Sequence, residues 1–271
     1  MTKAFVMNSF QWKDRHRLLH LLTPEHGLIT AMAPAAESLK SKLRAVSQLF
    51  SYSELTLSEQ NGRYTVKDGA VIEAFTALSQ DLDRLAAAAH AVEVFSDVAR
   101  NDEPNRQVFE LWAYTVYEIS RSEDPVFIAR MSSMRLMEII GLSPDLDACI
   151  SCREPIEGAY FFSYLAGGLL CEKDRAKGQR DAMTVLSKGT VALLLHIERA
   201  PFEKLYRFWQ AIRYAGKRVA SRTAGWRKKW KSAISACHCW IAALIFLLIQ
   251  RKAKRRVNRK EASYANLSKS I

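Results

Sequence analysis

The chain has 271 residues, 49% of them hydrophobic and 25% charged, which is the composition of a globular protein of about two domains. The formal net charge of +12 is unevenly placed: residues 1–205 carry 23 basic and 27 acidic side chains, and residues 206–271 carry 17 basic side chains and one acid. We expect no secretory signal, because the start of the sequence has no sustained apolar run. The few cysteines, three of them close together, indicate metal thiolates in a reducing compartment, not a disulfide framework.

Five short apolar segments in the first 78 residues predict a small closed β-barrel. They are Lys3–Ser9, Arg17–Thr23, Leu28–Ala33, Val46–Leu57 and Tyr64–Ile72. Turn signals separate them, because Pro24–Gly27 ends in a glycine that adopts positive φ easily and Asn61–Gly62 is a typical hairpin pair. One such barrel is the OB fold, which binds single-stranded nucleic acid through basic grooves and stacking aromatic side chains.

Basic side chains in this segment lie beside aromatic ones, which is the combination that single-strand binding needs. The candidate DNA-binding residues are Lys13, Arg15, Arg17, Lys40, Lys42, Arg44 and Arg63. Phe10 and Trp12 precede the first basic cluster, and Phe50 and Tyr52 follow the second. The alternative is a solvated basic rim with the aromatic rings in the barrel core, and for any single ring we expect the core.

Apolar residues at three- and four-residue steps predict three antiparallel helices between about residues 79 and 143. The third begins at Asp124 and Pro125, a capping residue followed by a first-turn proline. Methionines then form a stripe over residues 131–137, where we expect core packing and not an adaptable binding groove. Two further helices are predicted over Leu186–Ile197 and from Pro201 to Trp209.

Cys149-Ile-Ser-Cys152 and Cys171-Glu-Lys-Asp174 each bring two potential metal ligands together, with eighteen residues between the pairs. This is the spacing of a structural zinc site, and zinc binds Cys, His and sometimes Asp in a tetrahedron. We therefore predict zinc held by Cys149, Cys152, Cys171 and Asp174, where it would contribute folding free energy and no chemistry. The alternatives are a metal-free knuckle held by hydrophobic contacts and, with least support, a catalytic zinc.

The last part of the chain, residues 211–271, differs in composition from everything before it. It contains Ala233–Ile249, an apolar run at the lower length limit of a membrane span, which suits a cytoplasmic anchor. The abrupt switch to basic and tryptophan-rich sequence favours another interpretation, a change of reading frame near residues 206–212. We expect no metal site at Cys237–Cys239, because three adjacent residues do not complete a tetrahedron.

Several stretches before this tail follow one family pattern. They are Ser9–Asp14, Arg17–Ala31 and Lys40–Arg44 in the barrel segment, Glu103–Asn105 and Arg135–Cys149 in the helical part, and Ser163–Cys171 with its glycine pair. Over about residues 1–208 the chain thus resembles the RecO family of bacterial recombination mediators. It departs from that pattern at Pro34–Leu39, where the family usually has a glycine and an Arg-Arg or Arg-Pro pair.

The resemblance implies an α+β fold with an OB barrel over residues 1–78 and a helical domain over residues 79–210 that carries a zinc-knuckle-like segment at 145–180. It implies a cytoplasmic, nucleoid-associated mediator of DNA repair that binds single- and double-stranded DNA and anneals strands. The implied partners are RecR, the single-strand-binding protein and, indirectly, RecA. The sequence has no phosphate-binding loop, dinucleotide motif or nucleophile elbow, so we expect no enzyme. The alternatives are a divergent, non-catalytic interaction module and a membrane-tethered protein.

Overall fold

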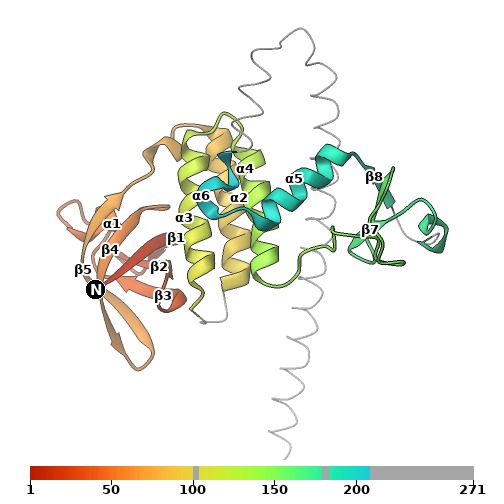
Figure 1. Cartoon of the computed structure of the whole chain (residues 1–271). Helices are drawn as coiled ribbons and strands as arrows, with labels where there is room; N and C mark the ends of the chain where they lie inside the picture. The colour runs from red at the N-terminus through yellow and green to blue at the C-terminus, as the bar shows by residue number, and fades with distance from the viewer. Residues whose placement is uncertain (100–103, 179–182, 208–271) are drawn as a thin grey trace, which may run out of the picture. The chain divides into compact units, whose positions relative to one another are not determined.

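The computed structural model describes residues 1–99, 104–178 and 183–207 (Figure 1). Within these ranges, residues 1–143 with 196–207 form one compact unit, and residues 144–195 form a second. The predictions for residues 211–271, including Ala233–Ile249 and Cys237–Cys239, lie outside the described residues. Among the helices of the described ranges, none has the length and apolar character needed to cross a membrane.

The first unit begins with a closed five-stranded barrel in the order β1-β2-β3-β5-β4, in which β4 pairs back onto β1. Its elements are β1 Thr2–Trp12, β2 His16–Thr23, β3 Gly27–Ala33, α1 Leu43–Val46, β4 Tyr52–Gln60 and β5 Arg63–Glu73. β3 and β5 pair in parallel, and the other neighbours are antiparallel. This is the five-stranded barrel of an OB fold, so the predicted fold class is confirmed.

Alternate residues of the strands fill the barrel, as the two-residue period of a strand requires. The interior side chains include Ala4, Val6, Leu19, Leu21, Ile29, Ala31, Leu55 and Val66. Both predicted turns are confirmed. Gly27 has φ of +64°, and Asn61 and Gly62 have φ of +53° and +72°, which is the sign that a two-residue hairpin turn of type I′ requires.

The predicted strand Val46–Leu57 is wrong in its first half. Val46 ends the short helix α1, and β4 begins only at Tyr52. Between them the Ser51 hydroxyl donates to the Val46 carbonyl at 3.1 Å, and Phe50 has φ of +66°. Serine side chains that bond to nearby backbone groups compete with strand pairing, and this competition ends the apolar run as a turn.

Three long helices follow the barrel in the same unit and run side by side (Figure 1). After the short η1 Thr76–Leu78, they are α2 Leu82–Ala99, α3 Arg106–Arg121 and α4 Pro125–Ile139. Asn105 caps α3 and Asp124 caps α4, each by accepting a hydrogen bond from a first-turn N–H at 3.1 Å. The methionines at 131, 134 and 137 are at most 8% exposed, which confirms the core interpretation of the stripe.

An aromatic cluster joins the barrel to α3. The ring of Phe5, on β1, stacks on Tyr52 at 4.3 Å between centroids and contacts Phe109 at 5.3 Å and Trp112 at 6.4 Å. Phe5 is 1% exposed and Trp112 is fully buried. Aromatic side chains bury large areas, so this cluster is a main source of hydrophobic stabilisation between the two parts of the unit.

The described chain ends with α5 Lys188–Arg199 and α6 Phe202–Leu205. Ser187 begins α5 by accepting a hydrogen bond from the Thr190 N–H at 3.1 Å, as the sequence predicts. The side chain of Tyr206 is 2% exposed, and its hydroxyl lies 2.9 Å from Thr115 Oγ1 on α3. The end of the described chain is therefore part of the core of the first unit.

The second unit contains a three-stranded sheet in the order β7-β6-β8, which the sequence analysis did not predict. The strands are β6 Tyr160–Ser163, β7 Gly168–Leu170 and β8 Met183–Leu186, and the short helix η2 spans Arg175–Gly178. Three- and four-residue strands are too short to show a clear alternation. Cys149, Phe161 and Leu170 form the small core beneath them.

The buried phenol of Tyr206 makes the free energy of unfolding depend on pH in the alkaline range. Burial raises the pKa of its phenol well above the usual value of 10.0. Above pH 10 the phenol stays protonated in the folded chain but ionises in the unfolded chain, so the unfolded state binds fewer protons. We expect the free energy of unfolding to fall above pH 10, with a contribution from Tyr206 of up to about 1.4 kcal/mol per pH unit. Urea denaturation at about pH 9 and pH 11 measures this. An unchanged pH dependence in Tyr206→Phe would contradict it.

Gly168→Ala is expected to destabilise the second unit. The added Cβ would lie 2.5 Å from Ile150 Cγ2 and 2.9 Å from the Asp145 carbonyl oxygen. Such overpacking costs about 1–3 kcal/mol of unfolding free energy, measurable by chemical denaturation. Gly189→Ala is the matched control, because its Cβ would meet only Ser187 Oγ at 3.9 Å. Equal stability of the two variants would show that the close approach at position 168 does not matter.

Candidate functional site

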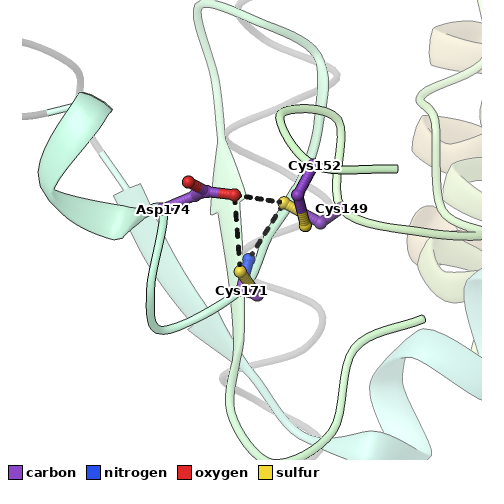
Figure 2. A group of neighbouring side chains, drawn as sticks. All are labelled: Cys149, Cys152, Cys171 and Asp174. Atoms are coloured by element: carbon purple, nitrogen blue, oxygen red, sulfur yellow. Dashed lines mark hydrogen bonds between the residues drawn. The ribbon is translucent and has the colours of Figure 1, made fainter. Parts of the chain in front are cut away.

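Four side chains of the second unit meet at one point (Figure 2). Cys149 and Cys152 come from a turn that precedes β6, Cys171 directly follows β7, and Asp174 directly precedes η2. One ligand atom from each, three sulfurs and a carboxylate oxygen, lie within 4.8 Å of one another. The fold therefore brings together the four residues that the sequence groups as metal ligands.

Two tight turns aim these side chains. In the first, the Arg153 N–H donates to the Cys149 carbonyl at 2.8 Å, and the Cys149 N–H donates to the Glu154 carbonyl at 3.0 Å. In the second, the Asp174 N–H donates to the Cys171 carbonyl at 3.2 Å. Each turn places two ligands that are three residues apart on the same side of the backbone (Figure 2).

Backbone pairing holds the first turn against β7. The Ile150 N–H donates to the Leu169 carbonyl at 2.8 Å, and the Asp145 N–H donates to the Gly167 carbonyl at 3.0 Å. Arg153, in the left-handed region with φ of +64°, also pairs with Asp145 at 2.7 Å. Both partners of that ion pair are exposed, so its contribution is small and the backbone hydrogen bonds carry most of the attachment.

Burial and hydrogen bonding differ among the four ligands. Cys149 is fully buried and Asp174 is 5% exposed, whereas Cys152 is exposed. Burial raises the pKa of Cys149, but backbone N–H groups of the two turns, among them that of Cys171 at 3.5 Å, together outweigh burial and lower it. For Cys152, the backbone N–H of Glu154 lowers the pKa, but desolvation and the neighbouring thiols and carboxyl outweigh it and raise the pKa to about 11.

The distances between the four candidate ligand atoms are close to those around a tetrahedrally coordinated metal ion. Zinc–sulfur bonds of about 2.3 Å place two sulfurs about 3.8 Å apart. Asp174 Oδ2 lies 3.5 Å from Cys149 Sγ and 3.6 Å from Cys171 Sγ. A cation would also favour the thiolate of Cys152, which its present neighbours disfavour. The four residues are therefore close enough, and chemically suited, to bind a metal.

Three of the candidate DNA-binding residues lie in or beside two exposed turns of the barrel. Lys13 and Arg15 belong to the turn between β1 and β2, and Arg63 begins β5 directly after the β4–β5 turn. In OB folds these two loops, with the surface of the second and third strands, bind oligonucleotides. The positions of these cations therefore match the binding surface of the fold.

Arg17 makes contacts within the barrel. Its guanidinium donates to the Glu37 carboxylate at 2.8 Å and to Ser9 Oγ at 2.9 Å, and its side chain is 27% exposed. The Glu37 N–H also donates to the Arg15 carbonyl at 3.1 Å. These bonds attach the loop 34–39 to the β1–β2 turn, so Arg17 has a structural role.

The second basic cluster follows this attached loop. Lys40, Lys42 and Arg44 are all exposed, the first two before α1 and the third within it. Because residue 37 is hydrogen-bonded to Arg15, the chain that leads to Lys40 starts beside the first cluster. The two clusters therefore border the same end of the barrel.

The two candidate pairs of aromatic residues have different environments. Phe10 and Trp12 are 47% and 46% exposed, whereas Phe50 is 4% exposed and Tyr52 packs against the core. The reason is a bulge in β1, where the register with β2 shifts between Val6 and Asn8. Before the bulge, even-numbered residues point into the barrel; after it, they point outward, and this brings Phe10 and Trp12 to the surface.

The first unit also contains a cavity of about 610 Å³ that was not predicted from the sequence. Its lining comes from β1, β2 and β3, from Leu49 and Phe50 just before β4, and from one side of α2. The α2 residues are Ala89, Val92, Glu93 and Ser96, whose steps of three and four place them on one helix face. That periodicity is visible in the sequence, but it does not indicate which barrel strands the helix faces.

Comparison with known families covers nearly the whole described chain. The family described as Recombination protein O N terminal matches residues 1–75. The family described as Recombination protein O C terminal matches residues 79–223. The second match extends to residue 223, beyond about residue 208, where the resemblance was predicted to end.

Individual relatives agree with this assignment. The DNA repair protein RecO of Acetivibrio thermocellus is 30% identical over 208 residues, which cover 76% of this chain and 82% of that protein. The DNA repair protein RecO of Listeria monocytogenes is 28% identical over 231 residues, which cover 84% of each chain. These matches confirm the resemblance inferred from the sequence, and the chain belongs to the RecO family of recombination proteins.

Proposed function

We propose that this RecO family member is a recombination mediator in DNA repair that binds single- and double-stranded DNA through its barrel. The observation that carries the proposal is the set of exposed cations beside the exposed rings of Phe10 and Trp12. The proposed phosphate-binding residues are Lys13, Arg15, Lys40, Lys42, Arg44 and Arg63. Arg17 belongs to the same surface, but its pairing with Glu37 neutralises its charge and makes it a positioning residue.

Local charge placement, and not the overall field of the barrel, would hold the DNA. Residues 1–78 carry nine basic and seven acidic side chains, so their long-range attraction for DNA is weak. Each phosphate contact with a single strand contributes about −0.7 to the slope of log Kobs against log salt concentration. Several cations bound to neighbouring phosphates would therefore make the affinity strongly salt-dependent, and bases stacked on the exposed rings would add a term that salt does not screen.

The remaining parts of the proposal rest on family membership. On bound DNA the protein would anneal complementary strands and, together with RecR and the single-strand-binding protein, help to load RecA. It would act in the cytoplasm, at the nucleoid, and without catalysing a reaction. The names of its relatives support a role in DNA repair.

In the second unit, Cys149, Cys152, Cys171 and Asp174 would hold a structural zinc ion. The ion would link the cysteine turn to the end of β7 and to the start of η2, and it would stabilise the fold when bound. Four protein ligands fill a tetrahedral zinc site and leave no position for a substrate, so the role would be structural.

Charge reversal at the barrel is expected to weaken single-strand binding and to flatten its salt dependence. The variant Lys13→Glu/Arg15→Glu/Lys40→Glu/Lys42→Glu/Arg44→Glu removes five proposed phosphate contacts. The slope of log Kobs against log salt concentration should become shallower by up to about 3.5, at about 0.7 per contact. Fluorescence anisotropy of a labelled oligonucleotide over a salt titration measures both the affinity and the slope.

Two controls separate the barrel from other cations. Arg106→Glu reverses an exposed arginine of α3, outside the barrel, and should leave the slope unchanged. A chain that ends after Arg207 removes the basic tail but keeps Tyr206, which the core of the first unit needs. If that shortened chain loses all binding while the barrel reversals have no effect, the site is wrongly assigned and an interaction module becomes the better description of the folded part.

The purified chain is expected to contain about one equivalent of zinc. Asp174→Ala should lower zinc affinity, whereas Asp174→Cys should retain or raise it by supplying a fourth thiolate. Affinity should rise with pH, because the ligands must lose protons and the pKa of Cys152 is about 11 without the ion. Elemental analysis and titration with a chromophoric chelator measure these effects. Less than about a tenth of an equivalent in the unmodified chain would remove the zinc proposal.

A further inference from the structure

The cavity between the barrel and α2 has the size of a binding site for a small ligand. Its volume of about 610 Å³ lies within the range of about 300–1,000 Å³ that is typical of ligand pockets. Six residues give it its chemical character: Phe10, His20 and Thr30 from three neighbouring strands, and Ala89, Glu93 and Ser96 from α2. All of them belong to the first unit, so the cavity is a feature of one compact body.

Ser96 gives the cavity a buried hydroxyl that a polar ligand could bond to. The residue is 8% exposed, and its hydroxyl has no hydrogen-bond partner among the residues that the structure describes. Buried hydroxyls on the neighbouring helices are satisfied by the carbonyl four residues earlier, as for Thr115 on α3 and Ser133 on α4. An unsatisfied buried hydroxyl is destabilising, and a ligand that bonds to it would remove that cost.

The charges of the lining favour a flat ligand with N–H donors over an anion. Glu93 is the one carboxylate among the described lining residues, and none of them is a lysine or an arginine. Glu93 would repel a phosphate or a peptide carboxylate, and the other polar lining residues, Asn8, His20, Thr30 and Ser96, offer hydrogen bonds but no permanent positive charge. A nucleobase fits this lining, because its faces are apolar and its edge carries amino or imino donors that a carboxylate accepts.

The place of the cavity in the barrel connects it to the proposed DNA path. Phe10 stands at its edge, with its exposed ring 5.3 Å from that of His20. Trp12 is two residues further along the same face of β1, about 6.8 Å away along the strand. Lys13 and Arg15 follow in the adjoining turn. A single DNA strand whose phosphates bind the β1–β2 turn would have its next bases beside the rings of Phe10 and Trp12 and beside the cavity.

We propose that the cavity between β1–β3 and α2 receives one unstacked base of single-stranded DNA. The base would leave the stack beside Phe10, its edge would face Glu93 and Ser96, and its phosphates would stay at the β1–β2 turn. The inference rests on the proposed DNA-binding function and adds to it a site for a base. It also implies a preference, because guanine presents two neighbouring N–H groups to a carboxylate and thymine presents one.

The test compares the intact full chain with Ala89→Leu, which fills the cavity from α2, and with Ala86→Leu. Ala86 is exposed on the same helix and does not line the cavity, so its variant is the matched control. Each protein is titrated with a labelled oligonucleotide and with an abasic one of the same length. We expect Ala89→Leu to bind the intact oligonucleotide about tenfold more weakly, as for one lost base stack, with an unchanged salt slope. Its affinity for the abasic oligonucleotide should equal that of the unmodified chain.

Other outcomes are decisive as well. Equal affinity of Ala89→Leu and Ala86→Leu for the intact oligonucleotide would overturn the base site and leave DNA binding in place, as would equal losses on intact and abasic DNA. Failure of the unmodified chain to bind either oligonucleotide would overturn both the base site and the proposed function. Because a larger side chain at position 89 can disturb the fold, Ser96→Ala serves as a second variant: it removes the hydroxyl that would face the base edge, keeps the surface rings, and should weaken binding of the intact oligonucleotide only.

The role of Glu93 has its own measurement. An oligothymidylate with a single central guanine should bind the unmodified chain several-fold more tightly than oligothymidylate alone. Glu93→Gln should reduce that ratio towards one, because a neutral amide accepts a weaker hydrogen bond than a carboxylate. Equal binding of the two oligonucleotides, or a preference that survives in Glu93→Gln, would overturn the assignment of Glu93 as the residue that contacts the base.

Discussion

The bulge in β1 is the constraint on which the first unit depends. β1 pairs with β2 on one side and with β4 on the other, so it closes the barrel. Before the bulge, Ala4 and Val6 fill the barrel, and Phe5 packs against α3. After it, the inward and outward positions exchange, and Phe10 and Trp12 reach the surface. A single extra residue thus lets one strand serve the core, the helices and the candidate DNA surface.

The two units are stabilised by different interactions. The first buries a barrel core and an aromatic cluster around Phe5 and Trp112, so its residues support one another through a large apolar interior. The second has three short strands and a core of a few side chains. A unit of this size gains much from an additional cross-link, and a metal ion bound to the four clustered side chains would provide one without a larger core. The proposed zinc ion would thus compensate for the small core that the short strands provide.

Much of the fold was predictable because its signals are local. Turn residues at Gly27 and Asn61–Gly62, capping residues at Asn105 and Asp124, and apolar periodicity are readable from neighbours in the chain. The strand predicted from Val46 was wrong in its first half because a serine-bonded turn competes with pairing there. The sheet of the second unit was missed because its strands are too short to show a period.

The sequence by itself determined the barrel, the helices, the four residues of the candidate metal site and the family, since spacing and pattern carry that information along the chain. Only the tertiary structure decided which candidates are exposed. It pairs Arg17 with Glu37, buries Phe50 and leaves Phe10 at the edge of the cavity. Each of these depends on strand register and on which helix face meets which strands. Such contacts join residues far apart in sequence, so no local pattern specifies them.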